Sequence, residues 1–185
     1  MNSHLFTGLE IIKPKFHLDK RGYFFESFNQ NIFKEQISKK ISFCQENESF
    51  SKKGVIRGLH YQLPPFAQSK LVRVVYGKVL DVVVDIRKGS PTFGKYFSKE
   101  ISAENRIQLF IPKGFAHGYI TLSDFSIFSY KVDNYFNNKS ERGILYNDLT
   151  LNIDWKLNKE EFILSKKDQN NPIFSKAEYF IFEND

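Results

Sequence analysis

A series of short apolar segments between residues 42 and 136 places the strongest constraint on the fold. Each segment is rich in β-branched and aromatic residues, which favour strands. Turn signals such as Gly77-Lys78 and Gly89-Ser90-Pro91 separate them at intervals of about ten residues. This spacing predicts an all-β sandwich, jelly roll or small barrel. The expected strands are Ile41 to Gln45, Val55 to Gln62, Lys70 to Tyr76, Val79 to Ile86, Lys95 to Ile101, Arg106 to Ile111, Phe115 to Leu122 and Ser126 to Phe136.

The flanking segments predict short additions to this β core rather than further domains. Residues Asn29 to Lys39 form the best helix candidate, with Asn29 as its cap. The segment after residue 150 is polar and irregular. The chain has no internal repeat, no linker and no long helical crossover, so we expect one domain over residues 1–185, with its core at about 42–136.

The charge and cysteine content limit the possible partners and location. The net charge of +6 suits nucleic acid, an acidic membrane surface or a small anionic substrate. No run of five like charges and no nucleic-acid motif occurs, which favours a phosphorylated small molecule. Cys44 is the only cysteine, and no apolar run approaches the roughly 20 residues of a membrane span. Since Met1 to Thr7 also lacks the pattern of a signal peptide, we expect a cytoplasmic protein with no membrane partner.

His60 is the first candidate for chemistry. In a regular strand it shares a face with Ile56, Gly58 and Gln62, and the glycine would leave space for a ligand beside the imidazole. An interior histidine that is bonded to a neighbour explains the same pattern. From the strand alone, the structural interpretation is slightly favoured over a catalytic base.

His117 raises the question of a metal site. Two histidines that face into one β-barrel suggest a metal, but the usual pattern adds a carboxylate two to six residues after the first histidine. Here Tyr61, Gln62, Leu63 and two prolines follow His60, so we expect no metal.

Several other polar residues have both a structural and a functional interpretation. Asp81 and Asp85 lie on one face of an apolar strand and need partners, for which an ion pair is the simpler explanation at Asp85. Tyr130 and Tyr135 fit ordinary strand packing. Arg21, Glu26 and Arg57 fit either surface charges or ligand contacts.

Longer motifs give these residues a common context. In chain order they are Arg21-Gly-Tyr-Phe-Phe-Glu26-Ser, Gln45-Glu-Asn47, Gly54-Val-Ile-Arg57-Gly-Leu-His60-Tyr-Gln62, Lys70-Leu-Val-Arg-Val, Asp81-Val-Val-Val-Asp-Ile-Arg-Lys-Gly-Ser-Pro-Thr-Phe-Gly94, Ile111-Pro-Lys-Gly-Phe-Ala-His117-Gly, Tyr130-Lys, Glu141-Arg-Gly-Ile-Leu-Tyr-Asn-Asp148 and Leu164-Ser-Lys-Lys167-Asp168. Together they resemble the dTDP-4-dehydrorhamnose 3,5-epimerase family over roughly residues 10 to 168.

The resemblance implies a cupin-like jelly roll (a double-stranded β-helix) with short peripheral helices. It further implies a homodimer whose N-terminal strands pack onto the partner, and no metal or other cofactor. The substrate would be a dTDP-linked 4-keto-6-deoxy sugar, epimerised at C3 and C5. A single-carbon epimerase and an epimerase of another nucleotide-linked 4-keto sugar are the alternatives.

The resemblance also implies roles for individual residues. His60 matches the base, Asp168 its carboxylate partner, Tyr130 the acid on the opposite face, and Lys70 the group that stabilises the enolate. The positions that match substrate contacts are Arg21, Glu26, Gln45, Glu46, Asn47, Arg57, Lys70, His117, Tyr135, Glu141 and Lys167. The departures from the family pattern are Glu48, Phe136, Tyr146, Leu149 and Lys156.

Arg57 presents a geometric problem within this pattern. It lies three residues before His60, so a regular strand would point the two side chains to opposite faces. Either a bulge intervenes, or Arg57 serves a different part of the ligand.

Overall fold

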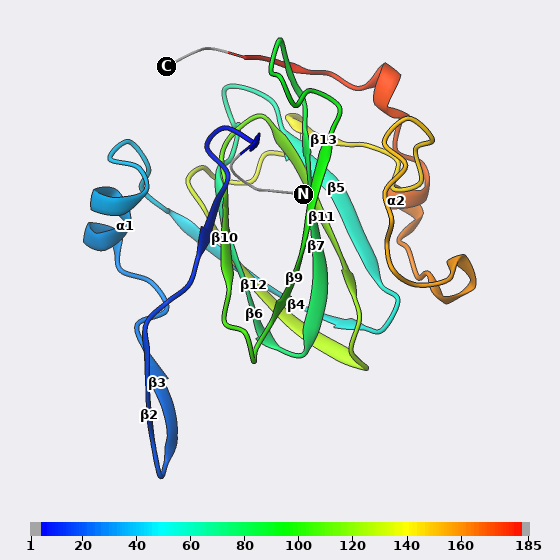
Figure 1. Cartoon of the computed structure of the whole chain (residues 1–185). Helices are drawn as coiled ribbons and strands as arrows, with labels where there is room; N and C mark the ends of the chain where they lie inside the picture. Colours follow the sequence, from blue (N-terminus) through cyan, green and yellow to red (C-terminus); the bar gives the residue numbers. More distant parts are fainter. Residues whose placement is uncertain (1–4, 183–185) are drawn as a thin grey trace.

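Two five-stranded antiparallel sheets pack face to face in the computed structural model, which describes residues 5–182 (Figure 1). The first sheet has the order β1-β10-β6-β12-β4 and the second the order β13-β5-β11-β7-β9. The strands of the first sheet are β1 (Glu10–Ile12), β10 (Gln108–Ile111), β6 (Lys70–Tyr76), β12 (Phe125–Val132) and β4 (Gln45–Lys52). The strands of the second are β13 (Glu141–Gly143), β5 (Ile56–Gln62), β11 (Phe115–Thr121), β7 (Lys78–Asp85) and β9 (Tyr96–Ser102). This arrangement confirms the all-β jelly roll that the spacing and the family resemblance predict.

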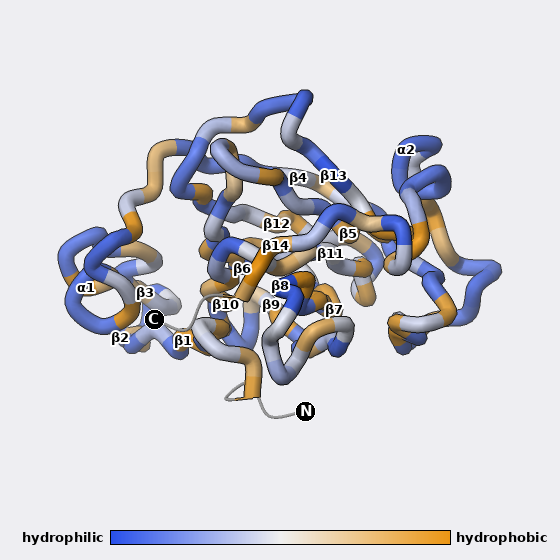
Figure 2. The backbone as a smooth tube through the Cα atoms, turned by 90° about the horizontal axis from the view of Figure 1, so that it is seen from above, coloured by the Kyte–Doolittle hydropathy of each residue, from blue (hydrophilic) through white to orange (hydrophobic). Residues whose placement is uncertain are grey.

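The main hydrophobic core lies between the two sheets. Val72, Val83, Leu109 and Phe128 are buried there at 0 to 1% exposure, because alternate residues of each strand face the opposite sheet. Figure 2, which looks down on the molecule, shows the apolar segments gathered on the central strands and the hydrophilic ones on the peripheral loops.

The outer face of the second sheet is covered by the chain that follows β13. Ile144, Leu151, Trp155 and Phe174 pack there against Ile56 and its neighbours. This segment contains α2 (Lys166–Gln169) and two 3-10 turns (Lys159–Glu161 and Phe174–Lys176), which agrees with its irregular sequence. Its packing places α2 beside β5, where the site described below is formed.

The outer face of the first sheet is covered only in part. Helix α1 (Gln30–Gln36) begins at Asn29, whose side chain accepts hydrogen bonds from the Asn31 and Ile32 amides, as expected of a cap. Its Phe33 packs on Leu71 and Phe110. Phe50, Tyr76 and Phe125 form an exposed aromatic patch farther along the same sheet.

A hairpin of β2 (Phe16–Asp19) and β3 (Gly22–Phe25) extends from the body below α1 (Figure 1). The strand spacing between residues 42 and 136 gave no indication of this hairpin. The expected strand Ile41 to Gln45 was also wrong, because the edge strand begins at Gln45 and continues to Lys52. Seven of its eight residues are polar and Phe50 is exposed, so a criterion based on apolar runs overlooks this strand.

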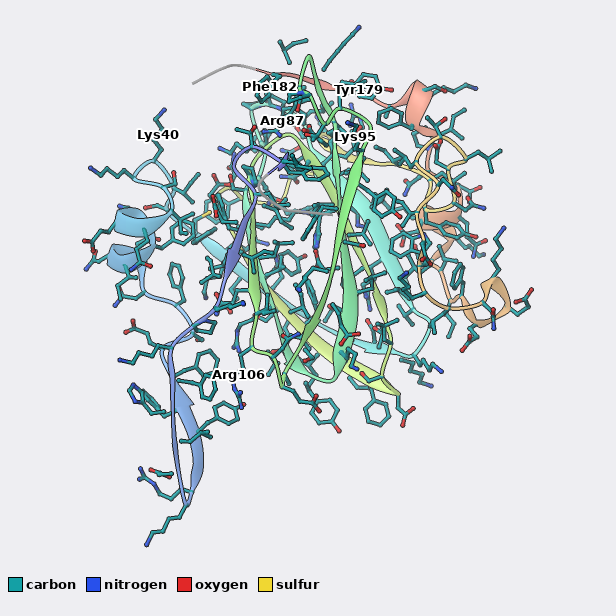
Figure 3. All side chains as sticks on the ribbon, viewed as in Figure 1. Lys40, Arg87, Lys95, Arg106, Tyr179 and Phe182 are labelled. Atoms are coloured by element: carbon teal, nitrogen blue, oxygen red, sulfur yellow. The ribbon has the colours of Figure 1, made fainter. Side chains whose placement is uncertain are left out.

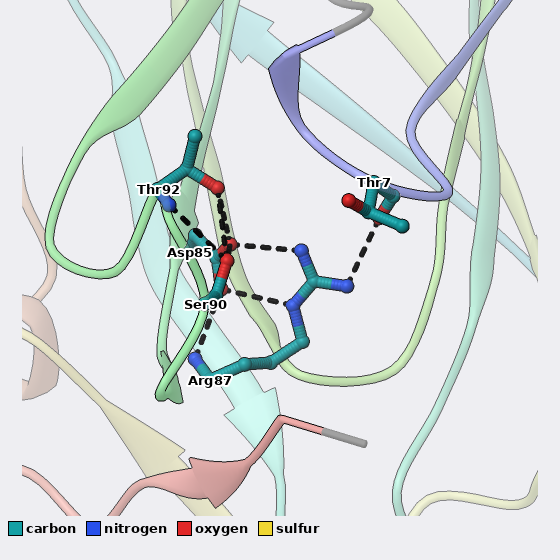
Figure 4. A network of polar contacts seen from close by, with 5 residues as sticks. All are labelled: Thr7, Asp85, Arg87, Ser90 and Thr92. Carbon is teal, nitrogen blue, oxygen red and sulfur yellow. Dashed lines mark hydrogen bonds and ion pairs between the residues drawn. The ribbon is translucent and has the colours of Figure 1, made fainter. Parts of the chain in front are cut away.

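An ion pair between Asp85 and Arg87 connects both ends of the chain to the second sheet. The Asp85 carboxylate accepts hydrogen bonds from Arg87, Ser90 and Thr92, and Arg87 also donates to the Thr7 carbonyl (Figure 4). The guanidinium lies 5.1 Å from the Phe182 ring, just after β14 (Phe180–Ile181), which pairs in parallel with β8 (Arg87–Lys88). Figure 3 labels Arg87 and Phe182 in this region. The partners of the buried Asp85 carboxylate offset the cost of removing its charge from water.

Candidate active site

A cavity of about 460 Å³ opens between the two sheets and extends to α2. A smaller cavity of about 170 Å³ adjoins it, and the two share Asn47, His60, Lys70 and Tyr130. The shared side chains come from β4, β5, β6 and β12, so both sheets contribute to one continuous cleft.

A β-bulge in β5 brings Arg57 and His60 to the same cavity. Along β11, His117 lies opposite His60 and Tyr119 opposite Arg57, so two residues of β11 span three of β5. The extra residue points both side chains inward and leaves Ile56 and Leu59 in the outer core. The bulge alternative is thus confirmed.

Gly58 permits this bulge, and the expectation that it leaves space for a ligand was wrong. Its φ is +113°, and a Cβ there would lie 2.6 Å from the Cα of Gly118. The space beside Gly58 is therefore filled by the neighbouring strand, and only glycine fits.

His60 forms a hydrogen-bonded pair with Asp168. Its Nε2 lies 2.5 Å from Asp168 Oδ1, which leaves Nδ1 as the nitrogen that can accept a proton. Asp168 is buried at 4% exposure, whereas the His60 side chain keeps 29%. Burial by itself raises the pKa of Asp168, but hydrogen bonds from His60 and Ser165 outweigh it and hold that pKa below its usual value. Asp168 is therefore a carboxylate that can stabilise an imidazolium.

Ser165 fixes the orientation of this carboxylate. It caps α2 by accepting a hydrogen bond from the Asp168 amide at 3.1 Å, and its hydroxyl donates to Asp168 Oδ2 at 2.9 Å. Ser165 was not among the site residues expected from the sequence. The spacing Ser165-x-x-Asp168, which is typical of a helix start, was the signal that could have found it.

Lys70 provides a buried cation at the same cavity. Its ammonium donates to the His60 carbonyl at 3.3 Å, and the residue is only 9% exposed. Burial lowers the pKa of Lys70 to about 8, although the charges of Asp81 and Glu141 oppose this shift. At neutral pH the side chain is charged and can stabilise a developing oxyanion.

Tyr130 projects into the cleft from β12. It is opposite Asn47 in the register with β4, so both side chains lie on the cavity face. Burial raises the pKa of Tyr130, which keeps its hydroxyl protonated at neutral pH. A protonated phenol in this position can donate a proton to a bound molecule.

His117 and Asp81 form a second pair at the back of the cavity. Nε2 of His117 lies 2.8 Å from Asp81 Oδ2, and the two residues are 7% and 0% exposed. Burial lowers the pKa of His117, so its imidazole is neutral at physiological pH and donates to the carboxylate. This pair supplies the partner of Asp81 that the sequence left open.

Two further cations border the cavity. Arg57 is held by bonds to the Ser51 hydroxyl (3.1 Å) and the Phe50 carbonyl (3.2 Å). Lys167 pairs with Glu141 at 2.6 Å across the mouth of the cleft. Together with Lys70 they make the cavity suitable for a phosphorylated molecule.

Most of the expected site residues therefore meet, but four do not. Glu46 lies on the outer face of β4, bonded to Ser129 and Lys131. Tyr135 is 63% exposed beyond the end of β12. Arg21 is at the tip of the hairpin, paired with Asp19, and Glu26 lines a separate cavity beside α1. The cavity instead includes Ser49 and Tyr119, whose hydroxyls lie 2.8 Å apart and which the sequence analysis did not identify as site residues.

Within residues 5–182, no three His, Cys, Asp or Glu side chains are grouped so that they could hold a metal ion. No helix in this part of the chain is long and apolar enough to cross a membrane.

The fold and the cleft define a class of protein. A base with a carboxylate partner, a phenol and a buried ammonium around one cavity can remove a proton from carbon, stabilise the resulting enolate and return a proton. This arrangement in a cupin-like jelly roll suits an isomerase that removes a proton from carbon and returns one.

Comparison with known proteins identifies the family within this class. The model of the dTDP-4-dehydrorhamnose 3,5-epimerase family matches residues 4–176, and the chain belongs to this family. It is 54% identical over 171 residues to dTDP-4-dehydrorhamnose 3,5-epimerase of Shigella flexneri, covering 92% of this chain and 93% of the relative.

Two solved structures bear on the substrate. A 3,5-epimerase from Legionella pneumophila in complex with dTDP-4-keto-L-rhamnose is 43% identical, with a TM-score of 0.91 and coverage of 96% of this chain and 95% of the other. A 3'-monoepimerase from Streptomyces bikiniensis in complex with dTDP-quinovose is 32% identical, with a TM-score of 0.86 and coverage of 92% and 85%. The chain is thus similar both to a protein described as acting on two carbons and to one described as acting on one.

Proposed function

We propose that this protein epimerises dTDP-4-dehydro-6-deoxy-D-glucose at C3 and C5 to dTDP-4-dehydro-L-rhamnose. The observation that carries the proposal is the convergence of His60, Asp168, Lys70 and Tyr130 on one cleft, in a chain of this family. A ketone at C4 acidifies the hydrogens on C3 and C5, because the electron pair left by either proton is delocalised onto the ketone oxygen.

In the proposed mechanism, Nδ1 of His60 takes the proton from carbon. The imidazolium that forms is stabilised by the Asp168 carboxylate at Nε2, which is 2.5 Å away. The C–H electron pair moves onto the C4 oxygen, and the ammonium of Lys70 stabilises the enolate. Tyr130 then donates its hydroxyl proton to the other face of the same carbon, which inverts it. The enolate electron pair returns from the C4 oxygen to this carbon as the new C–H bond forms. His60 then gives its extra proton to solvent and Tyr130 regains one from solvent, so both side chains are reset before the second carbon reacts.

The remaining cavity residues hold the substrate in this proposal. Arg57 and Lys167 contact the diphosphate, which suits their positive charges at the mouth of the cleft. His117, Gln45, Asn47 and Glu141 line the cleft where the sugar and nucleoside would lie. Phosphate binding by Lys167 would separate it from Glu141, its partner at 2.6 Å.

A homodimer is part of the proposal, since two of the four expected substrate contacts outside this cleft, Arg21 and Glu26, lie on or next to the β2–β3 hairpin. Arg21 is 84% exposed on the hairpin, and Leu18 and Phe24 beside it are 71% and 74% exposed. Apolar side chains exposed to this degree on an extended hairpin are typical of an interaction surface. We propose that the hairpin packs onto a partner subunit and brings Arg21 and Glu26 to that subunit's nucleotide. Glu46 and Tyr135 are assigned to the same nucleotide region.

Mixed dimers test this part of the proposal. His60→Gln inactivates the site of its own subunit, and Arg21→Ala weakens whichever site Arg21 serves. Subunits of the two variants are therefore unfolded together, refolded and assayed. If Arg21 acts across the dimer, each mixed dimer has one site with every functional residue, and a component with the unmodified KM appears. If Arg21 acts within its own subunit, no such component appears and the crossed arrangement is refuted.

The second candidate function is epimerisation at one carbon only. It is supported by the similarity to a 3'-monoepimerase and by Phe136, which lines the smaller cavity where the family frequently has tyrosine. The protein is incubated with dTDP-4-keto-6-deoxyglucose in deuterated water, and deuterium is mapped by NMR. Label at both C3 and C5 supports the leading proposal, label at one carbon supports the second, and no label refutes both.

A cytoplasmic location completes the proposal. Cys44, the only cysteine of the chain, is a free thiol, as is usual in a reducing compartment.

A further inference from the structure

The β2–β3 hairpin has one well-defined anchor on the body of the protein, the side chain of Arg106. The guanidinium carbon of Arg106 lies 4.4 Å from the centre of the Phe16 ring and 4.2 Å from that of the Tyr23 ring. Phe16 is on β2 and Tyr23 on β3, and the register places both rings on the same face of the hairpin. One cation therefore contacts both strands (Figure 3).

Arg106 is itself held firmly by the connection between β9 and β10. Asn105 accepts hydrogen bonds from the Ser102 and Ile107 amides, and its own amide donates to the Ser102 hydroxyl. The Arg106 amide donates to the Ser102 carbonyl, and its Nη1 donates to the Glu104 carbonyl. The side chain thus leaves a rigid turn in a defined direction.

Two features of Arg106 are unfavourable unless the contact with the hairpin offsets them. Its φ is +53°, a left-handed conformation that arginine adopts rarely. Its Nε is buried without a hydrogen-bond partner among the described residues. Asparagine or glycine would fit this backbone better, but neither could reach the two rings.

We propose that Arg106 is a positioning residue that fixes the direction of the β2–β3 hairpin and thereby places Arg21 for the diphosphate in the partner subunit's cleft. Arg21 lies in the turn between β2 and β3, so a small rotation at the base of the hairpin moves its guanidinium away from a phosphate oxygen. This inference rests on the homodimer proposed above. Arg106 touches no substrate and affects binding only through the hairpin.

The experiment compares kcat and KM of the full-length protein and its Arg106→Gln variant. Loss of the two ring contacts is expected to raise KM by about 5- to 30-fold and to leave kcat within twofold, because His60, Lys70 and Tyr130 are unaffected. Tyr23→Leu, which removes one ring, should raise KM by a smaller factor. Lys40→Gln changes the net charge equally at an exposed loop (Figure 3) and should leave both constants unchanged.

Two further variants separate positioning from folding. Arg106→Asn suits the left-handed backbone, so it should fold at least as stably as the unmodified protein and still show the higher KM. The double variant Arg106→Gln/Arg21→Ala should have the same KM as Arg21→Ala alone, because the hairpin acts through Arg21.

The outcomes distinguish this inference from the homodimer proposal. An unchanged KM in Arg106→Gln together with a raised KM in Arg21→Ala overturns the role of Arg106 and leaves the crossed contact intact. Additive effects in the double variant also overturn it. An unchanged KM in Arg21→Ala overturns the crossed contact, and the role of Arg106 with it.

Discussion

The substitution Asp168→Asn tests whether a buried carboxylate stabilises the charged form of His60. Asn keeps the size of the side chain and its capping bond with Ser165 but removes the negative charge next to Nε2. The lost interaction is a charge-assisted hydrogen bond, whose net free-energy contribution is typically about 1.5 to 3 kcal/mol. At about 1.4 kcal/mol per tenfold change, the rate of proton abstraction should fall roughly 10- to 150-fold. The partial exposure of His60, at 29%, favours the lower half of this range.

The assay for this variant is the rate at which deuterium from the solvent enters the substrate, followed by NMR under saturating substrate. Asp154→Asn is the matched control, since Asp154 is an exposed carboxylate that pairs with Lys156 on the surface. The control should exchange at the unmodified rate. If Asp168→Asn exchanges within threefold of the unmodified protein, the carboxylate does not stabilise the imidazolium and the dyad has no catalytic role.

Three further predictions concern the acid, the buried cation and the anchor of the chain ends. Tyr130→Phe keeps the ring but removes the proton donor, so formation of the epimerised sugar, measured by NMR, should fall about 100-fold or more; an unchanged rate would exclude Tyr130 as the acid. The pKa of Lys70 is about 8, so its positive charge and kcat/KM should decline as pH rises through 8. Glu141→Gln removes an anion that raises this pKa and should therefore move the decline of kcat/KM to lower pH. A shift of the decline to higher pH would contradict this. Arg87→Met leaves the Asp85 charge buried with only its hydroxyl and amide partners, and should cost about 3 kcal/mol in urea unfolding; a loss below about 1 kcal/mol would show that the ion pair contributes little.

The sequence predicted the jelly roll well because local patterns determine strands. Seven of the eight expected strands lie close to observed ones, since runs such as Val79 to Ile86 are buried on both faces and read clearly as apolar. The edge strand Gln45–Lys52 was missed because seven of its eight residues are polar, so no apolar run marks it. The apolar pattern gave no sign of the hairpin at Phe16–Phe25, because Phe16, Tyr23 and Phe24 are exposed and no core pattern marks it. N-terminal strands were expected only from the family resemblance.

The site was predictable only where a motif carried the information. The strand around His60 alone slightly favoured a structural interpretation over a catalytic one. The contact of His60 with Asp168 spans 108 residues, a separation at which no local pattern applies. The bulge that aligns Arg57 depends on the approach of Gly58 to a neighbouring strand, which is a tertiary property. In the proposed homodimer the place of Arg21 depends on the partner subunit, which no local pattern in the sequence of one chain encodes.

The central claim is that His60 removes the carbon-bound proton, and the variant His60→Gln tests it most directly. Glutamine can hydrogen-bond Asp168 but does not accept a proton at neutral pH, so the variant should bind dTDP with nearly unchanged affinity. In deuterated water, entry of label at both C3 and C5 should fall at least 1000-fold relative to the unmodified protein. Entry of label within fivefold of the unmodified rate, at either carbon, would show that another group is the base for that carbon.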